Sequence, residues 1–531
     1  MSNLTARKAA LSTLEGFEPT PTSLISYQSN GKVIVFGEQA TLARCNDFPS
    51  PLKLSLIVMD STGDSALPGA ISLNQRNIDI QGHLGGFVVN LIGPDNSVET
   101  LQADMVLDLN PEALISLEIP PPGYLHEILH SENLKQLQEQ LLDLIGEFEK
   151  PKYFSYDASI CAHGVNGKIV CTQCLDACPA GAISSLIETI EVDPYLCQGG
   201  GVCATVCPSG AIRYVYPRLA DSGNAIRKML QAFREQGGSQ ATVVFYAETE
   251  FPQNYLQDDD SILPVKVEEL ASVGADLCLS ALVYGASQVV LLGNDEVPET
   301  SLSQIEQQLA WLAPLLSAVG MNPRQICLQN NTDEIVQVNV KMQVEPALYT
   351  MPDSKRNAIF QALDHLYQHA KNPAEEVALP LGAPFGSALV DEKSCTLCMA
   401  CVGACPGKAL QDGSNRELPE LFFIEANCIQ CGACTTTCPE AAITISPRMI
   451  FDRELRNRSR ELNHDVPFAC ISCGKEFAPS SVIHKMSDKL KDHYMFKTSR
   501  ALDRLKMCED CRVADIVQDP EAMNSSFDPL N

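Results

Sequence analysis

The chain has 531 residues, of which 45% are hydrophobic and 20% charged, a composition typical of a globular protein with several domains. Its formal net charge of −28 argues against nucleic acid or an anionic membrane surface as a partner and favours a basic face on another protein. No segment has the roughly 18 consecutive apolar residues of a membrane span, and the N-terminus lacks the apolar core of a secretion signal, so we predict a cytoplasmic protein without a transmembrane segment.

Residues 1–150 predict a small α/β or mixed domain. It begins with the strand GKVIVFG and contains a hairpin, NIDIQGHLGGFVVNLI. Ser131 is placed to cap a helix over 131–150, with an apolar face formed by Leu134, Leu137, Leu141, Leu144 and Phe148. No GxGxxG follows a strand in this region, and GxxxxGK[ST] occurs nowhere in the chain, so nothing predicts nucleotide binding.

The 22 cysteines are the main chemical signal of the chain. All but Cys45, Cys278 and Cys327 fall into three tight groups, and we interpret these three as small buried apolar side chains. In a large chain of cytoplasmic character, such grouping indicates metal binding rather than disulfides.

Residues 151–222 carry the first group, in two runs that each end in Cys-Pro. The runs are Cys161-x9-Cys171-x2-Cys174-x3-Cys178-Pro179 and Cys197-x5-Cys203-x3-Cys207-Pro208. From the Cys-Pro pair onward these runs read CPAGAI and CPSGAI, and two later runs of the chain read CPGKAL and CPEAAI. The similarity indicates that one small unit is repeated four times. In two-cluster bacterial ferredoxins the fourth cysteine of each run binds the cluster of the other run. Crossed ligation therefore predicts one [4Fe–4S] cluster on Cys161, Cys171, Cys174 and Cys207.

The second cluster of this module is predicted to have only three thiolates, Cys178, Cys197 and Cys203, because Gly200 occupies the second-cysteine position of its run. By resemblance to seven-iron ferredoxins we expect [3Fe–4S]; a fourth [4Fe–4S] cluster with water at the open corner is the alternative. Lys168 stands where the first cysteine of the first run belongs, so Cys161 must return through the loop AHGVNG. We interpret His163 in that loop as a solvated side chain rather than a ligand.

Residues 223–345 alternate strands with helices and predict a flavodoxin-like α/β domain with a parallel sheet. Trp311 is expected in its core. Over 346–386 a helix, RNAIFQALDHLYQHA, precedes KNPAEEVALPLGAPFG, which we interpret as a linker.

Residues 387–450 contain the complete two-cluster ferredoxin pattern, with CxxCxxCxxxCP occurring twice. Zinc would leave the third and fourth cysteines of each run unexplained. Crossed ligation assigns one [4Fe–4S] cluster to Cys395, Cys398, Cys401 and Cys438, and another to Cys405, Cys428, Cys431 and Cys434. Because Cys401 and Cys405 are four residues apart, their Cα atoms lie within about 14 Å, so electrons can pass directly between the clusters.

Residues 451–531 contain two CxxC pairs, Cys470/Cys473 and Cys508/Cys511, which predict a zinc-ribbon-like element with one structural zinc. A rubredoxin-like iron is the alternative. Between the pairs, Ile483, Met486, Leu490 and Tyr494 have the spacing of one helix face.

Several segments resemble known families. ASVGADLCLSALVYGASQVVLLG resembles the iron–sulfur delta subunit that joins hydrogenases to heterodisulfide reductases. GHLGGF, DLNP, PPPGY, SCTLCMACVGACP and LKMCEDCR resemble a bacterial cytoplasmic 4Fe–4S ferredoxin-type family associated with formate dehydrogenases. The resemblance implies a redox protein partner, and formate dehydrogenase is one candidate. It also implies that members of the family have a cysteine at the position that Gly200 occupies in this chain.

These observations predict an α/β multidomain protein with two ferredoxin-like α+β modules that relays single electrons from a cytoplasmic dehydrogenase to another redox partner. The expected cofactors are three [4Fe–4S] clusters, one [3Fe–4S] cluster and a structural zinc. We expect an electron carrier or electron-transfer subunit without catalysis of its own. The alternatives are a subunit of a flavin-containing oxidoreductase and an assembly scaffold for a redox enzyme.

Overall fold

The computed structural model describes residues 3–60, 67–129, 133–248, 250–252, 255–256, 259–330, 335–336, 338, 344–413 and 419–520. The chain forms two compact units. The first comprises Met1–Asp157, Thr172–Leu309 and Asn322–His369; the second comprises Ala158–Cys171, Ala310–Met321 and Ala370–Asn531. Within the described ranges no helix is both long and apolar enough to cross a bilayer.

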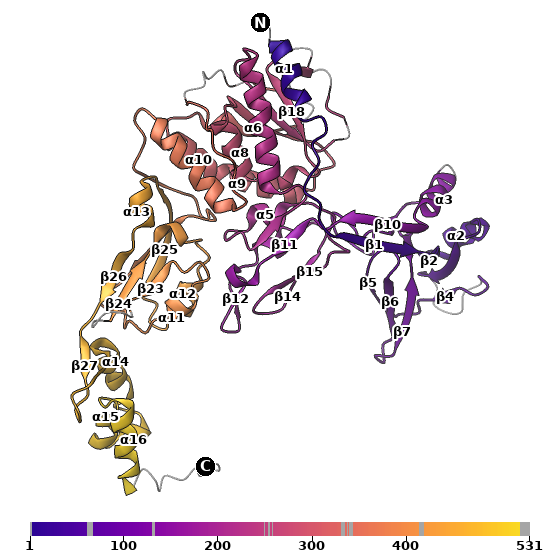
Figure 1. Cartoon of the computed structure of the whole chain (residues 1–531). Helices are drawn as coiled ribbons and strands as arrows, with labels where there is room; N and C mark the ends of the chain where they lie inside the picture. The colour runs from indigo at the N-terminus through magenta and orange to yellow at the C-terminus, as the bar shows by residue number, and fades with distance from the viewer. Residues whose placement is uncertain are drawn as a thin grey trace. The chain divides into compact units, whose positions relative to one another are not determined.

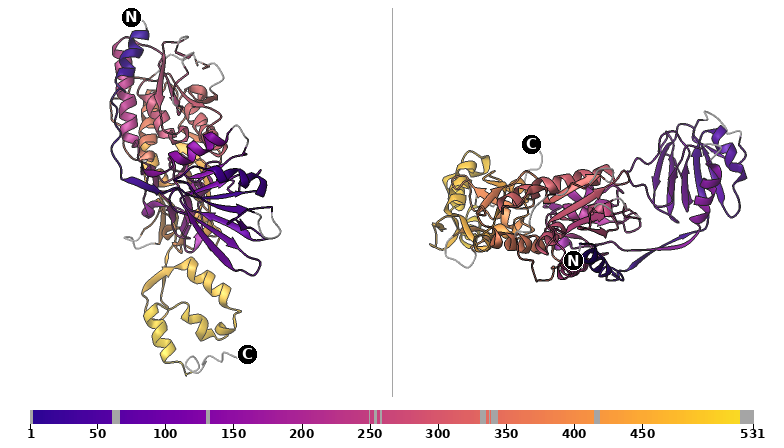
Figure 2. Two further views of the ribbon diagram at one scale, coloured as in Figure 1. Left: turned by 90° about the vertical axis from the view of Figure 1, so that its right-hand side faces the viewer. Right: turned by 90° about the horizontal axis from the view of Figure 1, so that it is seen from above.

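The N-terminal part of the first unit is built on a parallel five-stranded sheet in the order β4-β3-β2-β8-β9. Figure 1 labels β2 and β4 of this sheet, and Figure 2 shows the chain in two further views. On one face Val33 packs in a core with Leu141 of α3 (Leu134–Asp143), and on the other Phe36 packs with Phe87. The alternation follows the two-residue repeat of a strand. The strands are β2 (Lys32–Gly37), β3 (Lys53–Val58), β4 (Ile71–Ser72), β8 (Met105–Asp108) and β9 (Tyr124–His126), and the short helices α2 (Gln39–Leu42) and η1 (Ala43–Asp47) follow β2.

The predicted hairpin is confirmed, since β5 (Asn77–Gln81) pairs antiparallel with β6 (Phe87–Ile92), to which β7 (Val98–Ala103) adds a third strand. The motifs DLNP and PPPGY meet nearby, because the hydroxyl of Tyr124 donates a 2.5 Å hydrogen bond to the buried carboxylate of Asp108. These two motifs therefore contribute to packing within the N-terminal domain.

The predicted helix over 131–150 is wrong in its second half. The helix α3 ends at Asp143, and the chain continues into β10 (Gly146–Pro151), which pairs with β1 (Leu24–Ser29) and sets Phe148 opposite Tyr27. Ser131, the expected cap, lies outside the described residues. The β1–β10 ribbon runs from this domain to the first cysteine module (Figure 1).

The first cysteine module is closed by the antiparallel pair β11 (Phe154–Tyr156) and β16 (Ile212–Tyr214). Its remaining elements in the first unit are α4 (Gln173–Asp176), β14 (Ile183–Ser185), β15 (Ile190–Val192) and α5 (Val202–Val206). In the second unit, β12 (Gly164–Val165) and β13 (Lys168–Ile169) form a hairpin.

The predicted parallel sheet of the central domain is present, with four strands in the order β18-β17-β19-β20 and every pair parallel. Helix α8 is entirely buried and packs against α6 and α10, while the N-terminal helix α1 (Asn3–Ser12) also packs on α6. Cys45 and Cys278 are fully buried, as expected, whereas Cys327 is half-buried. The elements are β17 (Thr242–Tyr246), β18 (Ile262–Lys266), β19 (Gln288–Gly293), β20 (Ile326–Asn330), α6 (Leu219–Glu235), α8 (Ala275–Val283), α9 (Glu299–Ala318) and α10 (Lys355–His369).

The second unit contains the second ferredoxin-type module and the C-terminal region. Trp311 is buried and meets Phe385 edge-to-face. The segment interpreted as a linker in fact includes β21 (Glu376–Ala378), which pairs with β25 (Ile443–Ile450). The module also contains β22 (Gly386–Val390), α11 (Ala400–Gly403), β23 (Leu410–Asp412), β24 (Glu420–Phe423), α12 (Ala433–Thr437), α13 (Arg453–Asn457) and β26 (Arg460–His464).

The C-terminal region begins with the hairpin β27 (Pro467–Ala469) and β28 (Glu476–Pro479), followed by α14 (Ser480–Leu490), α15 (Ser499–Arg504) and α16 (Glu509–Val517). The predicted helix face is only partly correct. Ile483 is buried in α14, but Tyr494 lies beyond the end of the helix and is 72% exposed.

Candidate metal centres

Four thiols of the second module line one small cavity: Cys395, Cys398, Cys401 and Cys438. Burial, followed by the charges of the other three thiols, raises the pKa of the Cys401 thiol to about 12. Leu397 and Met399, between the first three, adopt left-handed φ values of 54° and 58°, which are unfavourable for residues with a Cβ and recur at ligand-binding loops. Four thiols gathered in this way would repel one another as thiolates, and they fit a metal cluster, which would supply the compensating positive charge.

A second set of thiols in this module surrounds Cys434: Cys405, Cys428 and Cys431. Burial, followed by the charges of these three neighbours, raises the pKa of Cys434 to about 12, and Cys401 of the first set makes a smaller contribution. The two sets are those that crossed ligation predicts, and they lie close enough to influence each other.

Hydrogen bonds reach several of these sulfurs. The main-chain N–H of Ala409 donates to Cys405 Sγ at 3.2 Å and that of Ala442 to Cys438 Sγ at 3.3 Å. The side-chain amide of Gln430 donates to Cys428 Sγ at 3.2 Å. Donors of this kind stabilise a thiolate and raise the reduction potential of a bound cluster.

In the first unit, Cys203 lies at the centre of a third set of thiols. Burial raises its pKa well above the ordinary value, and the further contributions come from Cys197, Cys178, Cys174 and Cys207 in decreasing order. The two nearest electrostatic neighbours are the residues predicted to share its cluster. We call Cys178, Cys197 and Cys203 the three-thiolate set.

Gly200 leaves room for a side chain at the position of the missing fourth ligand. An added Cβ would meet only Pro179 Cγ, at 4.0 Å. The two adjacent glycines do not have room for a side chain. Gly199 and Gly201 have left-handed φ values of 85° and 72°, and an added Cβ would contact Tyr153 at the first and Ser272 at the second. The backbone therefore permits a fourth thiolate at Gly200, and the sequence does not provide one.

Cys161 and Cys171 belong to the second unit, whereas Cys174 and Cys207 belong to the first. The loop after Cys161 is the β12–β13 hairpin, whose turn residues Asn166 and Gly167 both have positive φ, as a two-residue Asn-Gly turn requires. His163 is not solvated as expected but 1% exposed, with Nδ1 2.8 Å from the carbonyl oxygen of Cys171.

Cys171 also lies near the second module. The pKa of the Cys431 thiol is raised to about 11, mainly by burial and then by the charges of Cys405, Cys428 and Cys171. Cys431 therefore has two thiols of its own predicted set and one thiol of the first module around it.

Two lysines that the sequence interpretation missed contact the backbone of the first cysteine module. Lys150 of β10 donates to the carbonyl oxygen of Cys197 at 2.7 Å and to that of Tyr195 at 2.8 Å. Lys355 of α10 donates to the carbonyls of Ala204, Thr205 and Cys207, at 3.1 Å to the first and 3.2 Å to the last. No sequence motif marks either residue.

The loop that carries Cys197 is also held by the N-terminal domain. His83 of the GHLGGF motif stacks on Tyr195 with ring centroids 4.3 Å apart, and the hydroxyl of Tyr27 donates to the Tyr195 carbonyl at 2.6 Å. Burial lowers the pKa of the Lys150 ammonium to about 8, although Cys197 and Asp193 act in the opposite direction.

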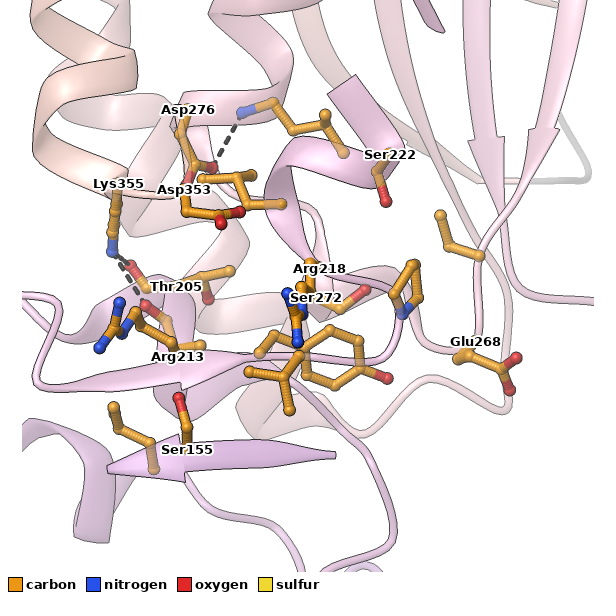
Figure 3. Close-up of a pocket in the computed structure, with 18 of the residues that line it drawn as sticks. Ser155, Thr205, Arg213, Arg218, Ser222, Glu268, Ser272, Asp276, Asp353 and Lys355 are labelled. Carbon is orange, nitrogen blue, oxygen red and sulfur yellow. Dashed lines mark hydrogen bonds between the residues drawn. The ribbon is translucent and has the colours of Figure 1, made fainter. Parts of the chain in front are cut away.

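A cavity of about 420 Å³ lies beside α5 (Figure 3). Ala204 and Thr205, which stand between Cys203 and Cys207, form part of its wall. Lys355 and the buried carboxylate of Asp276 also line it, together with Arg213, Arg218 and Glu268, which belong to or follow β16 and β18. The sequence interpretation did not predict this cavity.

The four C-terminal cysteines meet at one point, since the sulfurs of Cys470, Cys473, Cys508 and Cys511 all lie within 4.8 Å of one another. The separation of Cys473 Sγ and Cys508 Sγ is 3.7 Å, close to the about 3.8 Å edge of a tetrahedron with metal–sulfur bonds of about 2.3 Å. Desolvation opposes ionisation of Cys470, but main-chain N–H groups, chiefly that of Cys508, lower its pKa to about 6. Gly474, with φ of 77°, provides the tight turn after the first pair.

Comparison with known families finds ferredoxin-type domains in both cysteine modules. The 4Fe-4S dicluster domain matches residues 394–443, and the 4Fe-4S binding domain matches residues 190–213, a span that includes Gly200. No curated protein matches the chain. The chain is thus ferredoxin-like over these segments, and the thiol sets found there are candidate iron–sulfur sites.

Proposed function

We propose that the protein relays single electrons through a row of four iron–sulfur clusters. The observation that carries the proposal is the gathering of the second module's eight cysteines into two neighbouring sets, with Cys434 influenced by its own set and by Cys401. When bound, [4Fe–4S] clusters take up and release one electron each.

The proposed order of the row follows from shared loops. Cys178 and Cys203 of the three-thiolate set lie four residues from Cys174 and Cys207 of the set Cys161, Cys171, Cys174 and Cys207. The neighbourhood of Cys171 and Cys431 supports a step from there to the second module. The last step is supported by Cys434 and Cys438, which are four residues apart and belong to different sets. Cys438 belongs to the last set, with Cys395, Cys398 and Cys401.

For the three-thiolate set we propose [3Fe–4S], because Gly200 supplies no ligand atom. The other three sets are proposed to hold [4Fe–4S]. Anaerobic reconstitution followed by iron analysis tests this count, since about 15 iron atoms per chain are expected in these four clusters. A chain that holds no iron in either module would overturn the proposal.

For Cys470, Cys473, Cys508 and Cys511 we propose a structural zinc in a zinc-ribbon-like element. The tetrahedral sulfur spacing supports it, and the site contains no open position for a substrate. Rubredoxin-like iron has the same ligands, so metal analysis of the native protein distinguishes the two.

The proposed partners are a cytoplasmic dehydrogenase as electron donor and a second redox protein as acceptor. The resemblance in sequence makes formate dehydrogenase the first candidate for the donor. The net charge of −28 suits docking on basic protein surfaces. Copurification from native cells, with identification of the bound proteins, tests the partners; cluster-ligand variants that still support the partner's activity would favour a scaffold instead.

The cavity beside α5 favours a second candidate, a subunit of a flavin-containing oxidoreductase. Its volume of about 420 Å³ falls in the range of roughly 300–1,000 Å³ typical of ligand pockets. The strand order β18-β17-β19-β20 matches the first four strands of the flavodoxin-like order. Flavin absorbance released on denaturing the native protein would support this candidate.

A further inference from the structure

Two lysines hold the backbone on either side of the three-thiolate set. Lys150 reaches the carbonyl of Cys197, a member of the set, from the N-terminal domain. Lys355, from α10, reaches the carbonyls of Ala204, within α5, and of Cys207, directly after α5. Lys150 thus reaches a member of the set directly, whereas Lys355 reaches the segment between Cys203, a member of the set, and Cys207, a predicted ligand of the neighbouring set.

The ammonium groups also interact electrostatically with the thiols of the module. Burial lowers the pKa of Lys150, and the charge of Cys197 opposes this effect. Burial also lowers the pKa of Lys355, and the opposing charges are those of Asp276, then Cys207, then Cys203. Among the described residues, neither lysine forms an ion pair within 4.0 Å, although Asp193 and Asp276 act on them at longer range. Their positive charge is therefore not cancelled by an adjacent carboxylate.

The second module provides an internal comparison. There Lys485 donates to the carbonyl of Ser394, beside Cys395, but its ammonium also forms an ion pair of 2.6 Å with Glu440. The cation near this set is neutralised by a direct partner, whereas the two cations near the three-thiolate set are not.

We propose that Lys150 and Lys355 act as positioning residues that raise the reduction potential of the cluster on Cys178, Cys197 and Cys203, so that electrons collect there first. This inference rests on the proposed electron relay. Reduction adds one negative charge to a cluster, and a fixed positive charge in a poorly solvated site stabilises the reduced state. The three-thiolate set is thereby assigned as the electron-collecting end of the row.

The test is a reductive titration of the holoprotein, followed by EPR at the signal of each cluster. In the wild type, the cluster of the three-thiolate set should be reduced before the other three. Lys150→Met and Lys355→Met remove a charge while keeping the length of the side chain. Each should lower the midpoint potential of that cluster so that its reduced-to-oxidised ratio at fixed potential falls about tenfold, or about 59 mV for one electron.

Matched variants separate charge from structure. Lys150→Arg and Lys355→Arg keep the charge and should leave the potential unchanged, and Lys485→Met in the second module should leave this cluster unaffected. Lys355→Met removes the donor to three carbonyls and can impair cluster loading. Lys150→Met should disturb the backbone less, because Tyr27 still donates to the carbonyl of Tyr195. This variant therefore tests the inference even if Lys355→Met fails to bind its cluster.

The outcomes are distinguishable from failure of the relay itself. If the wild type shows all four clusters but the two Met variants leave the potential unchanged, or if another cluster is reduced first, the inference is overturned. If the wild type shows no cluster signal at all, the proposed relay fails before this inference is reached.

Discussion

A Cβ atom added to Gly200 would lie 4.0 Å from Cγ of Pro179 and would meet no other heavy atom within that distance. The fourth ligand of the three-thiolate set is thus absent although the backbone has room for it. Gly200→Cys should convert [3Fe–4S] to [4Fe–4S], because it restores the CxxCxxCxxxCP spacing. Iron should rise by about one atom per chain, and the EPR signal of the oxidised [3Fe–4S] cluster should disappear.

The adjacent glycines are the control for this substitution. A Cβ on Gly201 would come within 2.6 Å of the Cα atom of Ser272, and φ of 72° is strained for cysteine. Gly201→Cys should therefore lower iron content rather than raise it. An unchanged iron count and EPR signal in a folded Gly200→Cys protein would contradict the assignment of an open corner.

The step between modules is predicted to depend on Cys431, whose neighbours include Cys171. In the fully reduced wild type, the proximity of the clusters should broaden their EPR lines through spin–spin coupling. Cys431→Ser should remove the coupling between modules while signals from the first module persist. The half-buried Cys327 is a suitable control position, and Cys327→Ser should keep the wild-type line shape.

The C-terminal metal is predicted to be separate from the redox centres. Cys473→Ser should reduce zinc to far below one atom per chain and increase amide exchange in α14–α16, because the four sulfurs join the β27–β28 hairpin to α16. Iron in the ferredoxin-type modules should not change. Loss of iron without loss of zinc would show that the site holds iron instead.

The motifs DLNP and PPPGY are predicted to be structural. Tyr124→Phe removes the 2.5 Å hydrogen bond to the buried Asp108 carboxylate and should lower the free energy of unfolding of the N-terminal domain by about 1.5–3 kcal/mol. Asp108 retains donors from Asn110 and Leu114, so the domain should still fold. Denaturation curves give the stability, and an accompanying loss of iron would indicate a direct role at the clusters instead.

The thiol sets of the second module could be predicted from sequence because their ligands are set by short local spacings. The hairpin and the central parallel sheet could be predicted for a similar reason, since alternation and strand–helix order are local properties. Leucine spacing also supported a helix up to residue 150, but there the pairing of Phe148 with Tyr27, far away in the sequence, decided the structure.

The lysines at the three-thiolate set could not be predicted in this way. Lys355 contacts the carbonyl of Cys207, which is 148 positions away in the sequence. Every residue has a main-chain carbonyl, so a contact to one leaves no recognisable sequence motif. His163 is likewise buried directly before the β12–β13 hairpin, although its sequence context predicts only a loop that returns Cys161 to the cluster.

The relay is tested most directly by the number of electrons that the purified holoprotein accepts. Four one-electron centres predict uptake of about four electrons per chain from a low-potential reductant, with four successive changes in the EPR spectrum. Uptake of two electrons with bleaching of a flavin band, or no uptake by iron-loaded protein, would contradict the account.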